Sequence, residues 1–174
     1  MHTRIRKAIV AGVVLTMITA TQIAVLSQNR AADFSLRAID GPAITAEGLR
    51  GEVVVLAFGA SWLPLTRTQM EGLKKLADQY ASRGVAVYWV STESESPKSK
   101  NYASDDQLRE LARKYKMTVL RDPDGAVSKR LGVDQLPSIV LLDKQGNVSG
   151  EPIGGMDPNA SLATQLAPRL DKLL

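Results

Sequence analysis

The residues best placed to do chemistry lie in the segment Phe58–Arg67, which reads FGASWLPLTR. Its Thr66 stands at the predicted start of a helix, where free backbone N–H groups and the helix dipole favour negative charge. A threonine hydroxyl becomes a nucleophile only beside a base, and the chain's one histidine, His2, lies far from this segment. We therefore interpret Thr66 as the N-cap of the helix, with a residual ligand contact as the less favoured alternative.

The chain lacks the residues that most other site chemistries need. It has no cysteine, which excludes disulfides, thiolate nucleophiles and thiolate metal sites. With His2 alone it also offers no histidine–metal site. Asp122–Gly125 superficially suggests a calcium loop, but the remaining ligands are missing and a tight turn is favoured. The methionines are too scattered for a Cu(I) site and are predicted to pack in the core. The sequence thus predicts no metal and no cofactor.

The positive charge of the chain is concentrated at one end. The net charge is +4, from 22 basic and 18 acidic residues. Four of the basic residues lie in residues 1–30, which hold no acidic residue, so the rest of the chain carries 18 charges of each sign. Proteins that bind nucleic acid normally carry their excess positive charge on the folded domain. We therefore predict no nucleic-acid partner.

Residues 1–30 are predicted to be a signal anchor or a signal peptide. Arg4, Arg6 and Lys7 precede an uncharged, largely apolar run over Ala8–Leu26. This order is typical of a targeting segment, and the run is just long enough to span a bilayer. An uncleaved anchor is slightly favoured over a cleaved signal, and a buried amphipathic helix is the third interpretation. The positive-inside rule then places the domain outside the cytoplasm, as a single-pass membrane protein or as a periplasmic or secreted one.

Alternating strand and helix patterns make residues 33–174 one predicted domain. Continuous apolar, β-branched runs predict buried strands, whereas apolar residues at helical spacing predict amphipathic helices. The polar stretch Thr92–Ser104 is predicted to be a mobile surface insert. The predicted strands are Phe34–Ala38, Ala43–Thr45, Val53–Phe58, Val85–Ser91, Thr118–Leu120, Ser138–Leu142 and Val148–Glu151, and the predicted helices are Thr66–Ser82, Asp105–Tyr115, Ala126–Leu131 and Pro158–Leu174.

The order of these elements indicates an α/β fold. It runs from a β-hairpin through a βαβ unit and an inserted helix to a ββα ending. A strand–helix–strand unit forms a parallel pair with a right-handed crossover, and the ending adds antiparallel strands. We therefore predict a central mixed β-sheet, with Val53–Phe58 in its middle and helices on both faces.

Several segments, in the same order, resemble the TlpA/ResA-like thioredoxin-fold redoxins of the alkyl hydroperoxide reductase and thiol-specific antioxidant superfamily. The active-site segment of that family reads F-W-A-S-W-C-P-P-C-R, close to the FGASWLPLTR of Phe58–Arg67. Asp33–Gly41 looks like the family's opening hairpin, Leu49–Phe58 like the strand that leads into the site, and Gln135–Val148 like the proline loop and its hairpin. The resemblance implies a thioredoxin-like three-layer sandwich with an N-terminal β-hairpin and a cis-proline at Pro137.

The chain departs from that family at the two positions that carry its chemistry. Leu63 and Thr66 stand where the family has its cysteines. The family mechanism uses a thiolate at a helix N-terminus, where the pKa of the thiol is lowered, and a second thiol resolves the mixed disulfide. Leucine offers no nucleophile and threonine no thiol. The catalytic set implied by the resemblance is therefore empty in this chain.

The rest of the motif suggests that the chain has kept peptide binding after losing thiol–disulfide catalysis. The resemblance assigns Trp62, Pro64, Arg67, Leu136 and Pro137 to the former active-site face, and in relatives the proline loop pairs its backbone with an extended peptide. Our first hypothesis is a non-catalytic module that binds a protein or peptide partner there. An oxidoreductase or peroxidase that uses an external thiol is the second, and a purely structural subunit is the third. Trp62 is equally compatible with an exposed lip and with packing against the sheet edge.

Overall fold

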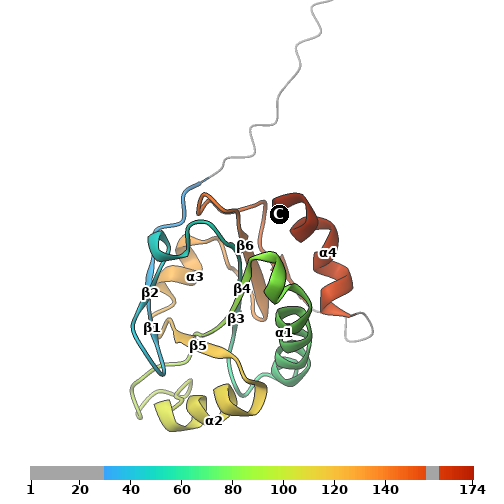
Figure 1. Cartoon of the computed structure of the whole chain (residues 1–174). Coiled ribbons are helices and arrows are strands. Elements are labelled where there is room, and N and C mark those ends of the chain that lie inside the picture. Colours follow the sequence, from blue (N-terminus) through green and yellow to red (C-terminus); the bar gives the residue numbers. More distant parts are fainter. Residues whose placement is uncertain (1–29, 156–160) are drawn as a thin grey trace, which may run out of the picture.

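One seven-stranded mixed sheet organises the chain, in the order β2-β1-β5-β4-β3-β6-β7 (Figure 1). The computed structural model describes residues 30–155 and 161–174. Strands β1 and β2 form the N-terminal hairpin, β3, β4 and β5 run parallel, and β6 and β7 continue the sheet in antiparallel fashion. The strands are β1 Ser35–Ala38, β2 Ile44–Thr45, β3 Val53–Gly59, β4 Val85–Ser91, β5 Thr118–Arg121, β6 Ser138–Leu142 and β7 Ile153–Gly154.

Strand β3 lies in the middle of the sheet because its side chains are apolar on both faces. It pairs in parallel with β4 and antiparallel with β6. Its side chains point alternately to the two faces of the sheet: Val53, Val55 and Ala57 enter one core cluster, whereas Val54, Leu56 and Phe58 enter the other. This confirms the predicted central strand.

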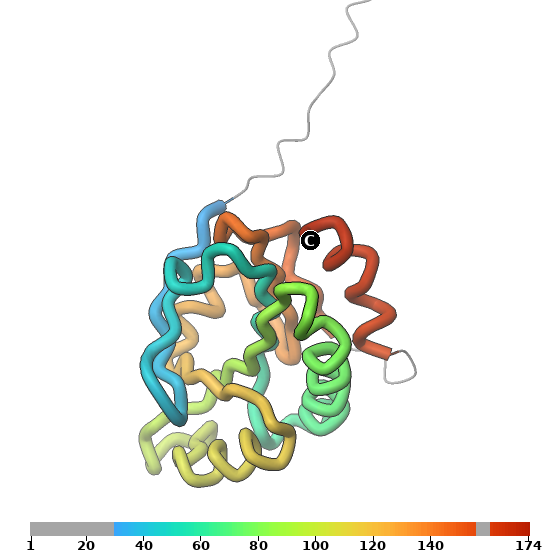
Figure 2. Tube along the Cα trace, viewed as in Figure 1, coloured from blue at the N-terminus to red at the C-terminus, as the bar shows by residue number. Residues whose placement is uncertain are grey.

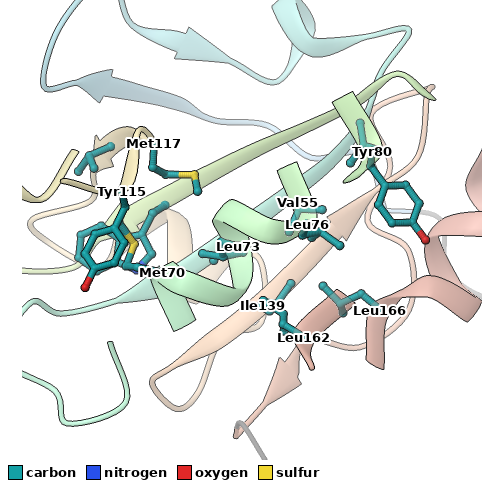
Figure 3. Close-up of a cluster of buried hydrophobic side chains, with 14 of the residues drawn as sticks. Val55, Met70, Leu73, Leu76, Tyr80, Tyr115, Met117, Ile139, Leu162 and Leu166 are labelled. Atoms are coloured by element: carbon teal, nitrogen blue, oxygen red, sulfur yellow. The ribbon is translucent and has the colours of Figure 1, made fainter. Parts of the chain in front are cut away.

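Helices cover both faces of the sheet and complete three layers. Helices α1 (Thr66–Tyr80), α2 (Asp105–Tyr115) and α4 (Leu162–Leu173) pack into one core cluster, and α3 (Ala126–Arg130) packs into the other. Two short 3₁₀ turns, Glu47–Leu49 and Ala81–Arg83, complete the elements of the described chain. Figure 3 shows the larger cluster, in which Met70 lies beside Tyr115 and Met117 while Leu162 and Leu166 approach Ile139. The fold is therefore the predicted thioredoxin-like sandwich.

Helices α1 and α4 approach each other closely at one point. A Cβ atom added to Gly72 of α1 would lie 2.9 Å from the Cβ of Leu162 in α4. Real Cβ atoms do not come so close, so glycine is the residue that this contact admits. Glycine costs about 1 kcal/mol in a helix interior relative to alanine, and here that cost is offset by close helix packing.

The sheet prediction was wrong in one segment. Val148–Glu151 does not form a strand, since only Val148 bridges to Leu142, and β6 pairs instead with the short β7. The physical reason lies after Val148, where Gly150 has a φ of 69° and directs the chain away from the sheet. The carbonyls of Ser149 and Glu151 then accept hydrogen bonds from Arg169 of α4 rather than from a neighbouring strand.

Two predictions fall partly or wholly outside the described residues. The predicted helix Pro158–Leu174 is confirmed as α4 from Leu162 onward, and residues 156–160 lie outside the description. The predicted anchor or signal peptide, residues 1–30, lies almost entirely outside it as well. Within residues 30–155 and 161–174, no helix is long and apolar enough to cross a membrane.

The described chain begins at one end of the sheet, and the loop that joins β3 to α1 lies at the other end. The carbonyl of Arg30 accepts a hydrogen bond from the N–H of Val148, and Ala32 bonds to Gly146. Those contacts lie beside the start of β3, whereas the loop between β3 and α1 follows the end of β3. Figure 2 shows the blue start of the described chain far from the first turn of α1 and from α2.

Candidate functional site

Three loops meet at the end of the sheet where β3 stops, because of the order of the central strands. Strands β4, β3 and β6 are neighbours, and β6 runs opposite to the other two. The loop at the end of β3 (residues 59–65, counting Gly59, the last residue of the strand) therefore lies between the loop after β4 (92–104) and the loop before β6 (132–137). We call these the site loop, the insert loop and the proline loop. Each of the five predicted binding residues lies in the site loop, in the proline loop or in the first turn of α1.

The site loop is a pair of consecutive turns that leads into α1. The N–H of Leu63 donates to the carbonyl of Ala60 at 3.1 Å, and the N–H of Thr66 donates to the carbonyl of Leu63 at 3.0 Å. The predicted N-cap was wrong by one residue: Leu65 is the N-cap and makes no side-chain cap. Thr66 instead begins the helix, buried, and its hydroxyl donates back to the Ala60 carbonyl. Its hydroxyl proton is thus engaged inside the loop.

Leu63 and Thr66, the two positions that the resemblance aligns with the family's cysteines, both carry side chains without redox chemistry. Leu63 is half-buried and Thr66 is fully buried. The turn that joins them is intact, since the Thr66 N–H bonds to the Leu63 carbonyl. The loop therefore keeps the compact geometry of a two-residue spacer while the chain, with no cysteine anywhere, has no thiol to place in it.

The large hydrophobic side chains that stay exposed in the described chain divide among these three loops. Trp62 of the site loop is 63% exposed, Tyr102 of the insert loop 37% and Leu136 of the proline loop 38%. Single exposed apolar residues are common on protein surfaces. Three of them at one end of the sheet, with no others of their kind among the described residues, form a candidate contact face. Trp62 is thus the exposed lip and not a residue packed against the sheet edge.

The proline loop is fixed beside the site loop by strand pairing. The Leu136–Pro137 peptide bond is cis, as predicted. Ser138, the next residue, pairs with Phe58 at the end of β3. Pro137 is itself buried and its carbonyl accepts a hydrogen bond from Gly155 at 3.3 Å. Leu136 is therefore the large apolar side chain of this loop that faces solvent.

Pro64 and Arg67 lie where the chain enters α1, shortly after Trp62 in the sequence. Pro64 is exposed in the site loop. Arg67 is also exposed, and it pairs with Glu71 one helical turn on, at 3.0 Å. The hydrogen bond that Arg67 donates to Glu71 raises the pKa of the guanidinium. The structure therefore places Arg67 along α1, with its guanidinium held by its own helix.

Two hydrogen-bonded links tie the site loop to the insert loop. The buried carboxylate of Glu93 accepts from the N–H of Ser61 at 2.9 Å and from the Ser61 hydroxyl at 2.6 Å. The indole N–H of Trp62 donates to the side chain of Asn101 at 2.7 Å. The exposed tryptophan is thus oriented by a polar contact at one edge of its ring, which leaves most of the ring surface open.

The insert loop itself is clamped by a buried arginine on β5. Arg121, with a side chain only 1% exposed, donates to the backbone carbonyls of Glu93, Ser94 and Ala103 at 3.0–3.2 Å. It also pairs with Asp105 at 2.6 Å. Both ends of the loop are therefore fastened to the sheet. The sequence predicted a mobile insert, and the structure shows a loop whose two ends are held by hydrogen bonds and whose Asn101 contacts the site loop.

A second arginine extends this charged cluster to the surface. Arg37 of β1 pairs with Asp105 at 3.0 Å and with Glu95 at 2.6 Å. Hydrogen bonds from Arg37, and then from Arg121, lower the pKa of Asp105 to about 2. The hydrogen bonds that Arg37 donates to Asp105 and to Glu95 raise the pKa of the Arg37 guanidinium. The cluster lines a cavity of about 280 Å³ that Tyr102 borders.

Sequence reasoning missed the residues that position the face. Glu93, Asn101 and Arg121 each read as an isolated polar residue in or beside a predicted loop. Only Glu93 and Arg121 carried a signal: Glu93 stands two residues after the strand Val85–Ser91 and Arg121 directly after the predicted strand Thr118–Leu120, where a charged residue needs a partner. Asn101 had no such signal, because its partner Trp62 is 39 positions away in the sequence.

The residues considered for metal binding have other roles in the structure. Asp122 accepts hydrogen bonds from the N–H groups of Val127 and Ser128, so it caps α3 within a tight turn. Met70 and Met117 are buried in the core. Among residues 30–155 and 161–174, no group of three or more histidine, cysteine, aspartate or glutamate side chains is placed to hold a metal ion.

Comparisons with known proteins agree with this architecture. The chain is 31% identical over 143 residues to the thiol:disulfide interchange protein DsbE of Pseudomonas aeruginosa, covering 81% of this chain and 73% of that one. It is 28% identical to the thioredoxin-like protein YneN of Bacillus subtilis, covering 78% and 76%. The exposed lipoprotein thioredoxin Etrx1 of Streptococcus pneumoniae superposes with a TM-score of 0.63 at 26% identity, over 82% of this chain and all of that one.

The family assignment follows from the sequence model of the AhpC/TSA family, which matches residues 27–150. That span contains the site loop, the insert loop and the proline loop. Relatives such as the thiol:disulfide interchange protein DsbE and the thiol-disulfide oxidoreductase ResA are named for thiol–disulfide chemistry. This chain has their fold without a cysteine. The chain belongs to the AhpC/TSA family as a cysteine-free member.

Proposed function

We propose that this chain is a non-catalytic thioredoxin-like module that binds an extended segment of a partner protein on the face made by its three loops. The observation that carries the proposal is the distribution of exposed apolar side chains. Trp62, Tyr102 and Leu136 are exposed together, while the two thiol positions hold Leu63 and Thr66. Aromatic anchors of this kind dominate the energetics of many protein interfaces.

The proline loop supports the proposed mode of binding. Among the described residues, no hydrogen bond engages the backbone N–H or carbonyl of Leu136. Extended peptides commonly bind by pairing their main chain with such free groups, and side-chain pockets then give specificity. A segment bound in this way beside Leu136 would place its side chains against Trp62. No thiol is needed for this recognition.

Site-specific photo-crosslinking tests the location of the partner. Pro64 is exposed in the site loop, two residues after Trp62, and Leu136 is exposed in the neighbouring proline loop, so each is replaced in turn by benzoylphenylalanine in the full-length chain. We expect both positions to capture the same protein. Arg130, exposed on α3, serves as the control position. Capture of the same protein from Arg130 with equal yield would place the contact elsewhere and contradict the proposal.

Truncation of the central anchor gives the quantitative test. With a partner in hand, Trp62→Ala is expected to weaken binding about thirtyfold, since loss of a central aromatic anchor typically costs about 2 kcal/mol or more. Titration calorimetry with the purified full-length chain measures this change, and circular dichroism checks the fold. Unchanged affinity for both Trp62→Ala and Leu136→Ala would remove this face from consideration.

The proposal also places the domain outside the cytoplasm. Its basis is the order of residues 1–30, in which three basic residues precede the uncharged run Ala8–Leu26. Either an uncleaved anchor or a cleaved signal gives this location. Mass spectrometry of the natively produced protein tests both: an intact N-terminus with membrane association supports the anchor, and a shortened chain supports cleavage.

The family itself favours a second function, thiol–disulfide exchange, because relatives such as DsbE carry that name. This chain would need a thiol from another molecule, since it has none. We expect no insulin reduction or peroxide consumption above background by the purified protein with a dithiol reductant. Turnover that scales with protein concentration would favour this second function over the binding module.

A further inference from the structure

The charges that border the contact face differ on its two sides. The site loop, residues 59–65, carries no charged residue. On the insert-loop side, Lys98 and Lys100 are exposed and make no ion pair within the described chain. On the proline-loop side, the exposed and equally unpaired charge is that of Asp134. The face is therefore positive beside Tyr102 and negative beside Leu136.

The positive side is not neutralised by the acids of its own loop. The carboxylate of Glu93 is buried and accepts hydrogen bonds from Ser61 and Ser91. The carboxylate of Glu95 pairs with Arg37 at 2.6 Å. Both acids are thus committed to holding the loop in place, and the two lysines are left as its free charges.

The lysines lie within reach of a ligand on Trp62. Asn101, which holds the indole N–H at 2.7 Å, directly follows Lys100 in the chain, so their Cα atoms are about 3.8 Å apart. An extended peptide advances about 3.3 Å per residue. A residue two to four positions from the one that covers Trp62 therefore comes within reach of the Lys100 side chain, and Lys98 lies two residues further along the same loop.

We propose that the segment bound on this face is an acidic, extended peptide: an apolar side chain covers Trp62, and one or two carboxylates, two to four residues away, meet Lys98 and Lys100. This ligand class rests on the proposed binding function and makes it more specific. The opposite polarity at Asp134 fixes the direction of the peptide, since acidic residues at its other end are repelled. Attraction between exposed charges is modest and screened by salt.

Peptide selection tests the ligand class and needs no identified partner. The probe is a phage-displayed library of random dodecapeptides, panned on the full-length chain and on Trp62→Ala in parallel. We expect peptides enriched on the wild-type chain to carry an apolar residue with Glu or Asp two to four positions to one side. Enriched apolar peptides without this acidic bias would overturn the ligand class and leave the binding function standing. No enrichment over Trp62→Ala would overturn the binding function itself.

Charge reversal then tests the assigned lysines. A selected peptide and its Glu→Gln counterpart are compared by fluorescence anisotropy. The acidic form is expected to bind the wild-type chain about fivefold more tightly at low salt, and the difference should vanish in Lys98→Glu/Lys100→Glu. The matched control, Lys129→Glu/Lys172→Glu, makes the same change in net charge on α3 and α4. Equal loss of the preference in the control would show an effect of overall charge and overturn the assignment.

Discussion

Two clusters of side chains hold the insert loop, and they differ in what they connect. In the first, the carboxylate of Glu93 accepts hydrogen bonds from the hydroxyls of Ser61 and Ser91 and from a backbone N–H. In the second, Arg121 and Arg37 meet Asp105. The first cluster joins the insert loop to the site loop, and the second joins it to the sheet.

The first cluster should therefore control the conformation of the site loop, and the second the stability of the whole domain. A network of hydroxyls and one carboxylate sets where Trp62 stands, and losing it should change a loop. The buried guanidinium of Arg121 has three carbonyl partners and two acidic partners, Asp105 and Glu95, and losing it should destabilise the whole fold. Four changes test this division, in order of the size of effect that we expect.

The largest expected change is a gain of chemistry in the site loop. Leu63→Cys/Thr66→Cys should produce a disulfide, because the turn between these positions holds their Cα atoms within about 7 Å, close to the span that a disulfide bridges. Thiol alkylation before and after a mild oxidant measures pairing. The single variants, which cannot pair internally, are the controls. Two thiols that remain free after oxidation would mean that the loop geometry is not that of its relatives.

The next largest effect is on global stability. Arg121→Met leaves Asp105 and the three carbonyls of the insert loop without their buried donor. We expect a loss of about 2–5 kcal/mol in the free energy of unfolding, measured by urea denaturation, because the buried carbonyls of Glu93 and Ala103 lose their donor and each unsatisfied acceptor costs about 1–3 kcal/mol. Arg130→Met is the matched control, because Arg130 is exposed and bonds only to Asp33 within the described chain. Equal stability of the two variants would contradict the structural role of Arg121.

A smaller and more local effect is expected at Glu93. Glu93→Ala removes the acceptor for the Ser61 N–H, which should cost about 1–3 kcal/mol and speed hydrogen exchange in residues 59–65. Glu93→Gln is the control: its oxygen can still accept from the Ser61 N–H while its amide donates to the serine hydroxyl. If the alanine variant exchanges no faster than the glutamine variant in this loop, the link does not hold the loop.

The smallest effect is a dependence of stability on pH. The pKa of Asp105 is lowered from 3.8 to about 2 in the folded chain, so its contribution to stability is present above about pH 4 and is lost as the pH falls toward 2. Because the carboxylate is 39% exposed, solvent screening reduces the loss to about 1 kcal/mol. Asp105→Asn should remove this part of the acid sensitivity. If the free energy of unfolding falls by the same amount in the wild-type chain and in Asp105→Asn between pH 5 and pH 2, Asp105 does not contribute to the acid sensitivity.

The sequence predicted the parts of the fold that depend on a pattern along the chain. Val53–Gly59 is buried on both faces, and such a strand leaves a continuous apolar run that is visible in one dimension. The helices are likewise visible in the sequence, as apolar residues that recur with the 3.6-residue period of a helix. The prediction of a strand over Val148–Glu151 failed because Gly150, inside that segment, adopts a left-handed conformation that turns the chain away, and a glycine in a sequence does not report the sign of its φ.

The candidate site was predictable where it rested on the motif and not where it rested on contacts across the sheet. Trp62, Leu136 and Pro137 followed from the resemblance. Tyr102 and the lysines of the insert loop did not, since they reach the face only because β4 lies beside β3. A polar loop with serines and a proline reads as a mobile segment, and the buried arginine that fastens it lies 18 positions beyond Ala103, near the loop's end.

Arg30, where the described chain begins, lies at the end of the sheet opposite the three loops, and this sets how far the contact face stands from residues 1–30. The seven residues of β3 separate the two ends by roughly 23 Å at 3.3 Å per residue. In a chain anchored through residues 1–30, the contact face would stand about that far, plus the loops, from its point of attachment. A partner tethered to the same surface would then meet this face at a raised effective concentration only if its own linker spans a comparable height. The domain would act as a spacer that selects partners by length as well as by sequence.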